Sequence, residues 1–360
     1  MRYLTLGEVC QKASSNVAQK DLENNNGDYE IYGASGLIKT VNFYHQEQPY
    51  IAIVKDGAGV GRAMLLPAKS SVIGTMQYII PNNNIDIRYL YYGIVYMELS
   101  RYYMGAAIPH IYFKDYQKER LPVPEKTEQI RIANVLEKID YLINIKNKQI
   151  NLFDELVKSR FIEMFGDFNL SNSHSEWRFI SEIGTVVGGA TPKTNVERYW
   201  DGEYRWITPA ELDDDSGYIY NSIRKLTKEG VESCSLQEMP IDTVILSSRA
   251  PIGKVAIAGK TFYCNQGFKN IICGKLIHPR YLYTILLLNK DYLNSLGRGA
   301  TFKEISKSIV ENIKIPVPPI ALQTQFATFV ESIDKLKLEA KQSLEKLETL
   351  KKSLMQEYFG

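Results

Sequence analysis

Two related nine-residue stretches, which share a Pro-Val-Pro run and a final Gln, divide the chain into two similar halves. Residues 121–129 read LPVPEKTEQ, and residues 315–323 read IPVPPIALQ, 194 residues later. A second stretch, RYLY, occupies residues 88–91 and returns unchanged at residues 280–283. Matches in the same order at nearly the same offset predict an internal duplication, with a pseudo-two-fold relation between the two halves.

Each half begins with a region of mixed composition and ends with a long region that lacks Pro and Gly. The mixed regions contain short β-rich runs, such as Tyr50–Val54 and Thr243–Leu246, separated by Gly, Pro and Asn. After each repeated motif, roughly 35 residues follow without a helix breaker. The predicted domains are a mixed domain at 1–120, a long helix at 121–167, a second mixed domain at 175–318 and a second long helix at 319–360.

Apolar residues recur with a 4-3 spacing in both long regions, which is the pattern of a coiled-coil seam. The seam positions are Ile132, Leu136, Ile139, Ile143, Ile150, Phe153, Val157 and Met164, and then Phe326, Val330, Ile333, Ala340, Leu344, Leu347, Leu354 and Tyr358. Charged residues interrupt the seam at Lys146, Arg160, Lys337 and Lys351.

A helix of this length, about 50 Å, cannot bury its apolar face alone. We therefore predict that the two helices pair as an antiparallel coiled coil and hold the mixed domains at a fixed distance. In the alternative, each helix packs on its own domain. The predicted fold class is α+β, in which two mixed β-rich domains alternate with the two long helices.

The overall charge of the chain is nearly balanced. Lys and Arg total 43 and Asp and Glu total 41, which gives a net charge of +2. The region 1–120 carries 12 basic and 11 acidic residues, and 175–318 carries 18 and 16. This balance does not by itself suggest a nucleic-acid binder. It predicts that any basic surface is local and confined to loops.

Cysteine, histidine and apolar residues indicate the compartment and exclude some classes of site. Four cysteines lie far apart without a C-x-x-C pair, and the four histidines are scattered as well. We expect free thiols and no metal site. The free thiols predict a cytoplasmic chain. No run of about 18 apolar residues occurs, so no membrane-spanning segment is expected.

The sequence lacks the motifs of the common catalytic sites. Residues 57–61 read GAGVG, which matches neither a P-loop nor a dinucleotide fingerprint and favours a strand-to-strand turn. The acidic run Asp213-Asp214-Asp215 is predicted to be a loop, with metal binding as the lesser alternative. No G-x-S-x-G motif occurs. We predict that the chain performs no chemistry.

Cations and small polar groups in loops of the mixed domains are the candidate DNA contacts. The stretch 188–194 suits phosphate contact, Arg249 offers a bidentate donor, and the amide of Gln266 suits adenine. A cation follows the last glycine of the turn in both copies, as Arg62 and Lys254. The predicted contacts are Lys55, Arg62, Tyr112, Lys114, Lys193, Thr194, Arg249, Lys254, Gln266, Lys269, Thr301 and Lys303.

Two variable domains that alternate with two long helices resemble the specificity subunit of type I restriction–modification systems. Each helix is introduced by an apolar-Pro-Val-Pro motif with a Gln five residues on, at Pro124 and Gln129 and again at Pro318 and Gln323. The stretches 249–254 and 265–268 are similar to the second target-recognition domain of that family, and 177–183 is similar to its domain starts. The first half departs further from the pattern.

The resemblance implies a function. Each target-recognition domain is expected to read one half of a split site on double-stranded DNA, while the paired helices set the spacer. Two methyltransferase subunits are expected to dock on the chain and to bring S-adenosylmethionine. Restriction/translocase subunits are expected to use ATP and Mg²⁺, and no cofactor is expected in this chain.

Other functions remain as alternatives. The near-neutral charge suits a coiled-coil scaffold with two protein-binding domains and no DNA. A DNA-binding protein outside restriction–modification is a further alternative, and a nuclease or nucleotide-binding protein would need the carboxylate cluster or P-loop that the sequence lacks. Salt-dependent binding of duplex DNA would decide against the scaffold.

Overall fold

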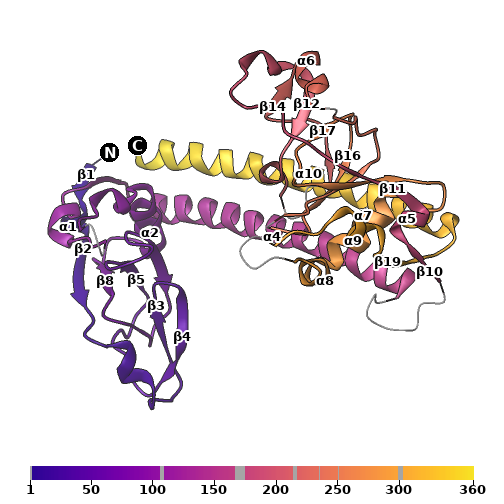
Figure 1. Cartoon of the computed structure of the whole chain (residues 1–360). Helices are drawn as coiled ribbons and strands as arrows, with labels where there is room; N and C mark the ends of the chain where they lie inside the picture. Colours follow the sequence, from indigo (N-terminus) through magenta and orange to yellow (C-terminus); the bar gives the residue numbers. More distant parts are fainter. Residues whose placement is uncertain are drawn as a thin grey trace. The chain divides into compact units, whose positions relative to one another are not determined.

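The computed structural model describes residues 2–105, 109–166, 175–213, 217–234, 236–249, 251–298 and 303–360. The chain folds into two compact units, which are drawn in Figure 1. The first unit contains Met1–Gln149 and Ala340–Gly360, and the second contains Ile150–Glu339. Each unit is therefore completed by residues from both halves of the sequence.

The first unit combines small sheets with short helices. Its four-stranded sheet runs in the order β2 (Cys10–Ser14), β8 (Met76–Pro81), β5 (Tyr50–Val54) and β6 (Ala63–Leu66). A three-stranded sheet contains β4 (Gly36–Val41), β3 (Tyr29–Gly33) and β7 (Ser71–Val72). β1 (Arg2–Thr5) pairs antiparallel with β9 (Arg120–Val123). The helices are α1 (Leu6–Val9), η1 (Gln19–Leu22), α2 (Ile87–Tyr96), η2 (Leu99–Tyr102) and α3 (Phe113–Tyr116).

The second unit repeats this plan with additions. Its five-stranded sheet runs in the order β11 (Gly184–Gly188), β18 (Lys269–Cys273), β15 (Val244–Leu246), β16 (Val255–Ala258) and β13 (Tyr218–Ile219). A three-stranded sheet contains β14 (Arg224–Leu226), β12 (Trp200–Ile207) and β17 (Tyr263–Cys264). β10 (Glu176–Phe179) pairs antiparallel with β19 (Lys314–Val317). The helices are α5 (Ile180–Ile183), η3 (Glu197–Tyr199), η4 (Pro209–Glu211), α6 (Lys228–Glu232), α7 (Pro279–Leu288), α8 (Lys290–Ser295) and α9 (Lys307–Glu311).

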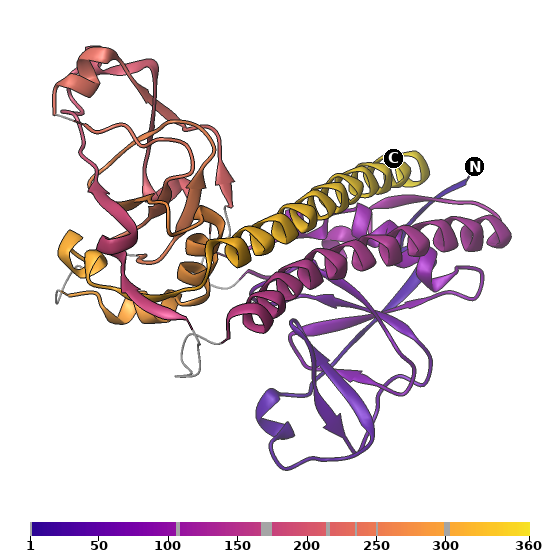
Figure 2. The same ribbon diagram turned by 90° about the vertical axis from the view of Figure 1, so that its right-hand side faces the viewer.

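The two long helices are α4 (Lys126–Phe165) and α10 (Ile320–Phe359), drawn in magenta and yellow in Figures 1 and 2. In the first unit, the Nζ of Lys351 lies 2.6 Å from the Oδ1 of Asp140. In the second unit, the Nζ of Lys337 lies 2.5 Å from the Oδ1 of Asp154. Residues later in α4 thus meet residues earlier in α10, and the predicted antiparallel pairing is confirmed.

The predicted seam is the buried face of both helices. Leu136 of α4 and Phe326 of α10, near the helix starts, lie in the apolar cores of the two units. Ile150 and Leu347, near the middle, are half-buried. The start of each helix therefore does pack on its own domain, as the alternative supposed, and the helices pair as well.

The glutamine of the repeated motif anchors the start of α4. Gln129 is buried, and its Nε2 donates to the carbonyl oxygens of Pro124 at 2.9 Å and Asn84 at 3.3 Å. Its Oε1 accepts from the backbone N–H of Asp86 at 2.9 Å. One side chain thus satisfies partly buried backbone groups of the Pro motif and of the loop before α2.

The second copy of the motif makes the same contacts. Gln323 donates from Nε2 to Pro318 O at 2.7 Å and to Leu276 O at 3.0 Å. Its Oε1 accepts from the backbone N–H of His278 at 2.8 Å, directly before α7. The spacing of five residues between Pro and Gln therefore serves the fold, because it lets the Gln side chain donate to the Pro carbonyl in both copies.

Each copy of the RYLY stretch packs against the C-terminal end of one long helix. The ring of Tyr89 in α2 lies 5.0 Å from that of Phe359, at the end of α10. The ring of Tyr281 in α7 lies 4.9 Å from that of Phe165, at the end of α4. Each tyrosine also donates its hydroxyl to the first proline carbonyl of the motif, at 2.6 and 2.8 Å. Each helix thus begins on one unit and ends in the core of the other.

The glycine-rich stretch is a strand-to-strand turn, as predicted. It connects β5 to β6, which pair antiparallel. Gly57, Gly59 and Gly61 all have positive φ, between 82° and 86°. A Cβ on Gly61 would lie 2.3 Å from the backbone nitrogen of Ser100, so no other residue fits there. The equivalent turn between β15 and β16 keeps one such residue, Gly253, with φ of 87°.

The four cysteines, Cys10, Cys234, Cys264 and Cys273, are free thiols in the described part of the chain, as predicted. Burial raises the pKa of Cys10, Cys264 and Cys273 to about 12, which makes their thiolates rare near neutral pH. Among the described helices, none is both long and apolar enough to cross a membrane.

Candidate nucleic-acid interface

Separate stretches predicted to contact DNA meet on one side of the second unit. The backbone N–H of Ser248 donates to Gly267 O at 2.7 Å, and that of Ile305 donates to Ser248 O at 2.9 Å. The hydroxyl of Thr191 donates to the Oε1 of Gln266 at 2.5 Å. These bonds join the loops after β11, β15 and β17 to the segment before α9. The predicted loops therefore form a continuous surface.

Two predicted cations are gathered by one carboxylate on this surface. The Nε of Arg249 lies 3.1 Å from one oxygen of Glu304, and the Nζ of Lys269 lies 3.4 Å from the other. Lys269 also donates to the hydroxyl of Ser248 at 3.3 Å. The Arg249 side chain is 48% exposed, whereas that of Lys269 is 13% exposed. Glu304 thus holds an exposed guanidinium beside a partly covered ammonium.

Sequence reasoning missed Glu304, which lies 55 residues from Arg249. It also missed Arg298, whose backbone pairs with that of Glu304. A hollow of about 750 Å³ beside the cluster is lined by Lys269, Arg298 and Lys307 together with Glu304. Lys307 pairs with Glu311 at 3.7 Å, so three cations and two carboxylates leave a small positive excess, which favours an anionic group in this hollow. No local pattern in the sequence marked these positions.

The other predicted DNA contacts of the second unit differ in how exposed their side chains are. Lys193, Thr194 and Lys303 are exposed. Lys254 is half-buried, because its ammonium donates to the backbone carbonyl of Leu212. Its cation is therefore engaged in holding the loop after η4. Thr301 lies outside the described residues, as do Asp214 and Asp215 of the acidic run.

Three of the four predicted DNA contacts of the first unit, Lys55, Tyr112 and Lys114, are connected through Asp56 and His110. The Nζ of Lys55 lies 2.8 Å from the Oδ2 of Asp56, whose other oxygen contacts the Nδ1 of His110. The His110 ring lies 4.1 Å from that of Tyr112, and the Nζ of Lys114 lies 5.1 Å from the Tyr112 ring centre. Tyr112 and Lys114 are exposed, whereas Lys55 is half-buried, so the group offers one exposed cation and an aromatic face to solvent.

Asp56 orders this group, and sequence reasoning missed it together with His110. Burial alone would raise the pKa of Asp56, but hydrogen bonds from Lys55 and His110 outweigh burial and hold it below its ordinary value. Arg62 lies apart from the group, since its Nη1 donates to the carbonyl of Ala34 at 3.1 Å. Within the described ranges, no three His, Cys, Asp or Glu side chains gather closely enough to hold a metal ion.

The chain is similar to known specificity subunits. One relative is the type I restriction enzyme MjaIX specificity subunit of Methanocaldococcus jannaschii, 35% identical over 209 residues. That alignment covers 57% of this chain and 48% of the relative, so about half of the relative's length is matched. Another is the type I restriction enzyme EcoR124I/EcoR124II specificity subunit of Escherichia coli, 24% identical over 290 residues, or 75% of this chain and 68% of the relative.

Solved structures share the fold. The S subunit of a type I restriction–modification system from M. genitalium matches with a TM-score of 0.67 and 16% identity, over 100% of this chain and 96% of that one. A chain described under complex assembly and conformational transition of the type I R-M system matches with a TM-score of 0.60 and 15% identity, over 99% and 97%. The family model of the type I restriction modification DNA specificity domain matches residues 1–152 and 172–349. The chain belongs to this family.

Proposed function

We propose that this chain is the DNA-recognition subunit of a type I restriction–modification complex and that each unit reads one half of a bipartite site. The observation that carries the proposal is the surface of the second unit, where Arg249, Lys269 and Gln266 come together from separate loops. Its counterpart in the first unit is the group of Lys55, Tyr112 and Lys114, in which Tyr112 and Lys114 are exposed.

The chemistry of the second surface suits both phosphate and base contacts. Arg249 presents a planar fork of donors, which pairs well with guanine or with a phosphate. Gln266 presents an amide, which can donate to and accept from adenine. Lys269 is held by Glu304 and Ser248 and supplies fixed positive potential behind them. Such a surface positions DNA through cations and selects a sequence through few polar groups.

The long helices suit the role of a spacer. Each has 40 residues, which corresponds to about 60 Å of helix, or somewhat under two turns of DNA. An antiparallel pair resists bending better than one helix, because ion pairs and apolar seam residues fix its register. The spacer between the two half-sites then follows from helix length.

The remaining activities belong to other subunits in this proposal. Two methyltransferase subunits would bring S-adenosylmethionine and methylate adenine, and restriction/translocase subunits would supply ATP- and Mg²⁺-dependent translocation and cleavage. The chain itself would hold no cofactor and act without catalysis. The names of its relatives support this division, since they are specificity subunits of restriction enzymes.

Mapping methylated adenines in a host genome tests the proposal. With the chain present, one bipartite motif is expected to carry methyl groups, and without it that motif is unmodified. Arg249→Ala should relax or abolish recognition at one half-site only, because its guanidinium belongs to one unit. Lys260→Ala, at an exposed lysine of the same unit outside the cluster, should leave the motif unchanged. A motif that is the same with and without the chain would refute the role.

A further inference from the structure

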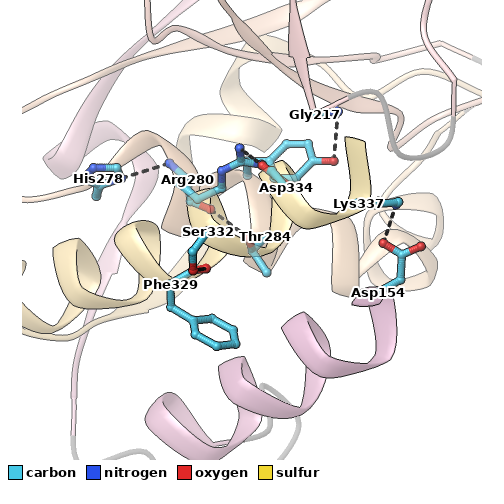
Figure 3. A network of polar contacts seen from close by, with 10 residues as sticks. Asp154, Gly217, His278, Arg280, Thr284, Phe329, Ser332, Asp334 and Lys337 are labelled. Carbon is cyan, nitrogen blue, oxygen red and sulfur yellow. Dashed lines mark hydrogen bonds and ion pairs between the residues drawn. The ribbon is translucent and has the colours of Figure 1, made fainter. Parts of the chain in front are cut away.

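The second unit contains a pocket that no motif in the sequence indicated. It has a volume of about 400 Å³ and lies among α4, α7 and α10, the region shown in Figure 3. Its apolar lining comes from Val157, Tyr283, Leu287, Leu288 and Val330. Such walls favour an apolar or aromatic group over a hydrated ion.

The corresponding place in the first unit is filled by a tyrosine of the chain itself. Tyr92 follows the RYLY stretch of α2 directly, and its ring is only 3% exposed. Its hydroxyl donates to the Oδ2 of Asp140 at 2.9 Å. The ring meets Tyr91 edge-on at 5.2 Å, and Lys351 pairs with the other oxygen of Asp140. The first unit thus shows what this site holds when it is occupied.

The second unit has smaller residues at two of these positions. Thr284 stands where Tyr92 stands in the first copy, and Val157 stands where Lys351 stands. Thr284 turns its hydroxyl back to the carbonyl of Arg280 at 2.8 Å, as seen in Figure 3. The carboxylate is retained as Asp334. The loss of a ring and of a lysyl chain therefore leaves space beside a retained acceptor.

The polar groups at the pocket indicate a neutral hydroxyl. Three acids, Asp154, Glu155 and Asp334, balance the cations Lys158, Arg280 and Lys337, so the lining carries no net charge. This balance disfavours a phosphate or an ammonium group.

Asp334 leaves hydrogen-bonding capacity for such a hydroxyl, since its side chain is 47% exposed. The Arg280 side chain is 5% exposed and is held in place by Asp334. Asp334 accepts from Arg280 through Oδ2 at 2.6 Å, and a carboxylate can accept further bonds. A phenolic hydroxyl can donate to Asp334, as that of Tyr92 donates to Asp140, and the ring can face Tyr283 as Tyr92 faces Tyr91.

We propose that this pocket receives a tyrosyl side chain of a partner protein, in the place that Tyr92 fills in the other unit. The ring would lie against Tyr283 and the leucines of α7, and its hydroxyl would reach Asp334. The site is separate from the candidate DNA surface. Tyrosine is also a residue that protein interfaces favour as an anchor, because it buries a large ring and keeps one polar contact.

Binding of p-cresol, the side-chain analogue of tyrosine, tests the pocket directly. In methyl NMR of the full chain, p-cresol should shift Leu287, Leu288 and Val330, and toluene should bind at least several-fold more weakly because it lacks the hydroxyl. Thr284→Tyr should abolish these shifts by filling the site, and Thr284→Ser should retain them. Binding by the Thr284→Tyr protein equal to wild type, or no binding by wild type, would overturn the proposal.

A reciprocal variant keeps the test valid if Thr284→Tyr fails to fold. Tyr92→Thr should create p-cresol binding in the first unit, at methyl groups near Asp140. Val157→Phe narrows the pocket from α4 and should weaken p-cresol binding in the second unit. Unchanged binding in the Val157→Phe protein, or an absence of new binding in a folded Tyr92→Thr protein, would count against the proposal.

The partner is tested in the assembled complex, and this part rests on the proposed function. Binding of p-cresol at Leu287 and Leu288 should disappear when the methyltransferase subunits are bound, and Thr284→Tyr should lower their affinity at least tenfold. If p-cresol binds the complex as well as the free chain, the occupant is not a side chain of that partner and the proposal fails. The methylated motif, mapped in parallel, reports separately on DNA recognition.

Discussion

The buried glutamines show that the most recognisable residues of this chain serve its folding. Gln129 and Gln323 each satisfy three backbone groups between a proline motif and the loop before a helix. Their positions could be predicted from the repeated sequence, because both copies keep the same spacing. Two of the three partners of each glutamine could not be predicted, since they lie more than 40 residues away in the chain.

Gln323→Ala should destabilise the second unit by about 2–4 kcal/mol, because it leaves buried backbone groups without partners. Urea denaturation monitored by circular dichroism measures this change. Gln325→Ala removes an exposed glutamine from the same helix and should change stability by less than about 0.5 kcal/mol. Equal effects of the two substitutions would show that the contacts of Gln323 are not needed.

His278 caps α7 in a way that depends on its protonation. Its Nδ1 accepts from the backbone N–H of Arg280 at 3.2 Å, which requires a neutral ring. Burial lowers the pKa of His278 below its ordinary value of 6.5, and Arg280 lowers it further, whereas Asp242 and Glu331 oppose the shift. Because the folded pKa is depressed, the unfolded chain takes up the proton first as pH falls.

The stabilisation from His278 should therefore be complete above about pH 6.5 and decline as pH falls below that value. His278→Asn keeps a capping acceptor that does not titrate. The difference in the free energy of unfolding between wild type and this variant should shift in favour of the variant between about pH 7.5 and pH 5.5. A difference that is constant with pH would show that His278 does not titrate in this window.

At the scale of elements, the long helices were the most predictable part of the fold. The 4-3 rhythm identified the seam that the structure buries, and helices at Lys126–Phe165 and Ile320–Phe359 lie within the predicted regions. The charged seam positions Lys337 and Lys351 are paired with aspartates of the facing helix. Periodicity could not identify those aspartates, because they lie off the seam.

Removal of one heptad from both helices should shorten the DNA spacer and leave both half-sites unchanged. Deletion of residues 144–150 together with 341–347 preserves the heptad phase and the two interhelical ion pairs. The helices become shorter by about 10 Å, which corresponds to about three base pairs. The methylated motif in a host genome measures the result, and an unchanged spacer would contradict the role of the helices as a ruler.

Deletion of residues 144–150 from α4 alone is the matched control. It shifts the register, so the ion pairs Asp140–Lys351 and Asp154–Lys337 cannot form together. We expect this protein to melt at a lower temperature than the double deletion, because one end of the seam loses its partner. Equal melting temperatures would show that the register is not fixed by these contacts.

At the scale of the whole molecule, duplication explains both what is shared and what differs. The core of each unit includes a phenylalanine from the end of the long helix that begins in the other unit. Phe359 packs on Tyr89, and Phe165 packs on Tyr281. The two copies keep the contacts of the motif glutamine and differ at other positions. Tyr92 and Thr284 illustrate this, since one fills a site that the other leaves open.

The repeats, helix breakers and heptads were enough to establish the duplication, the α+β class, the paired helices and the glycine turn, because all of these follow from local patterns. Only the tertiary structure showed that Glu304 gathers Arg249 and Lys269, that Lys254 is turned toward Leu212, and that a pocket opens beside Thr284. These features depend on side chains tens of residues apart. Their contacts arise when loops fold onto one another, and no spacing along the chain records them.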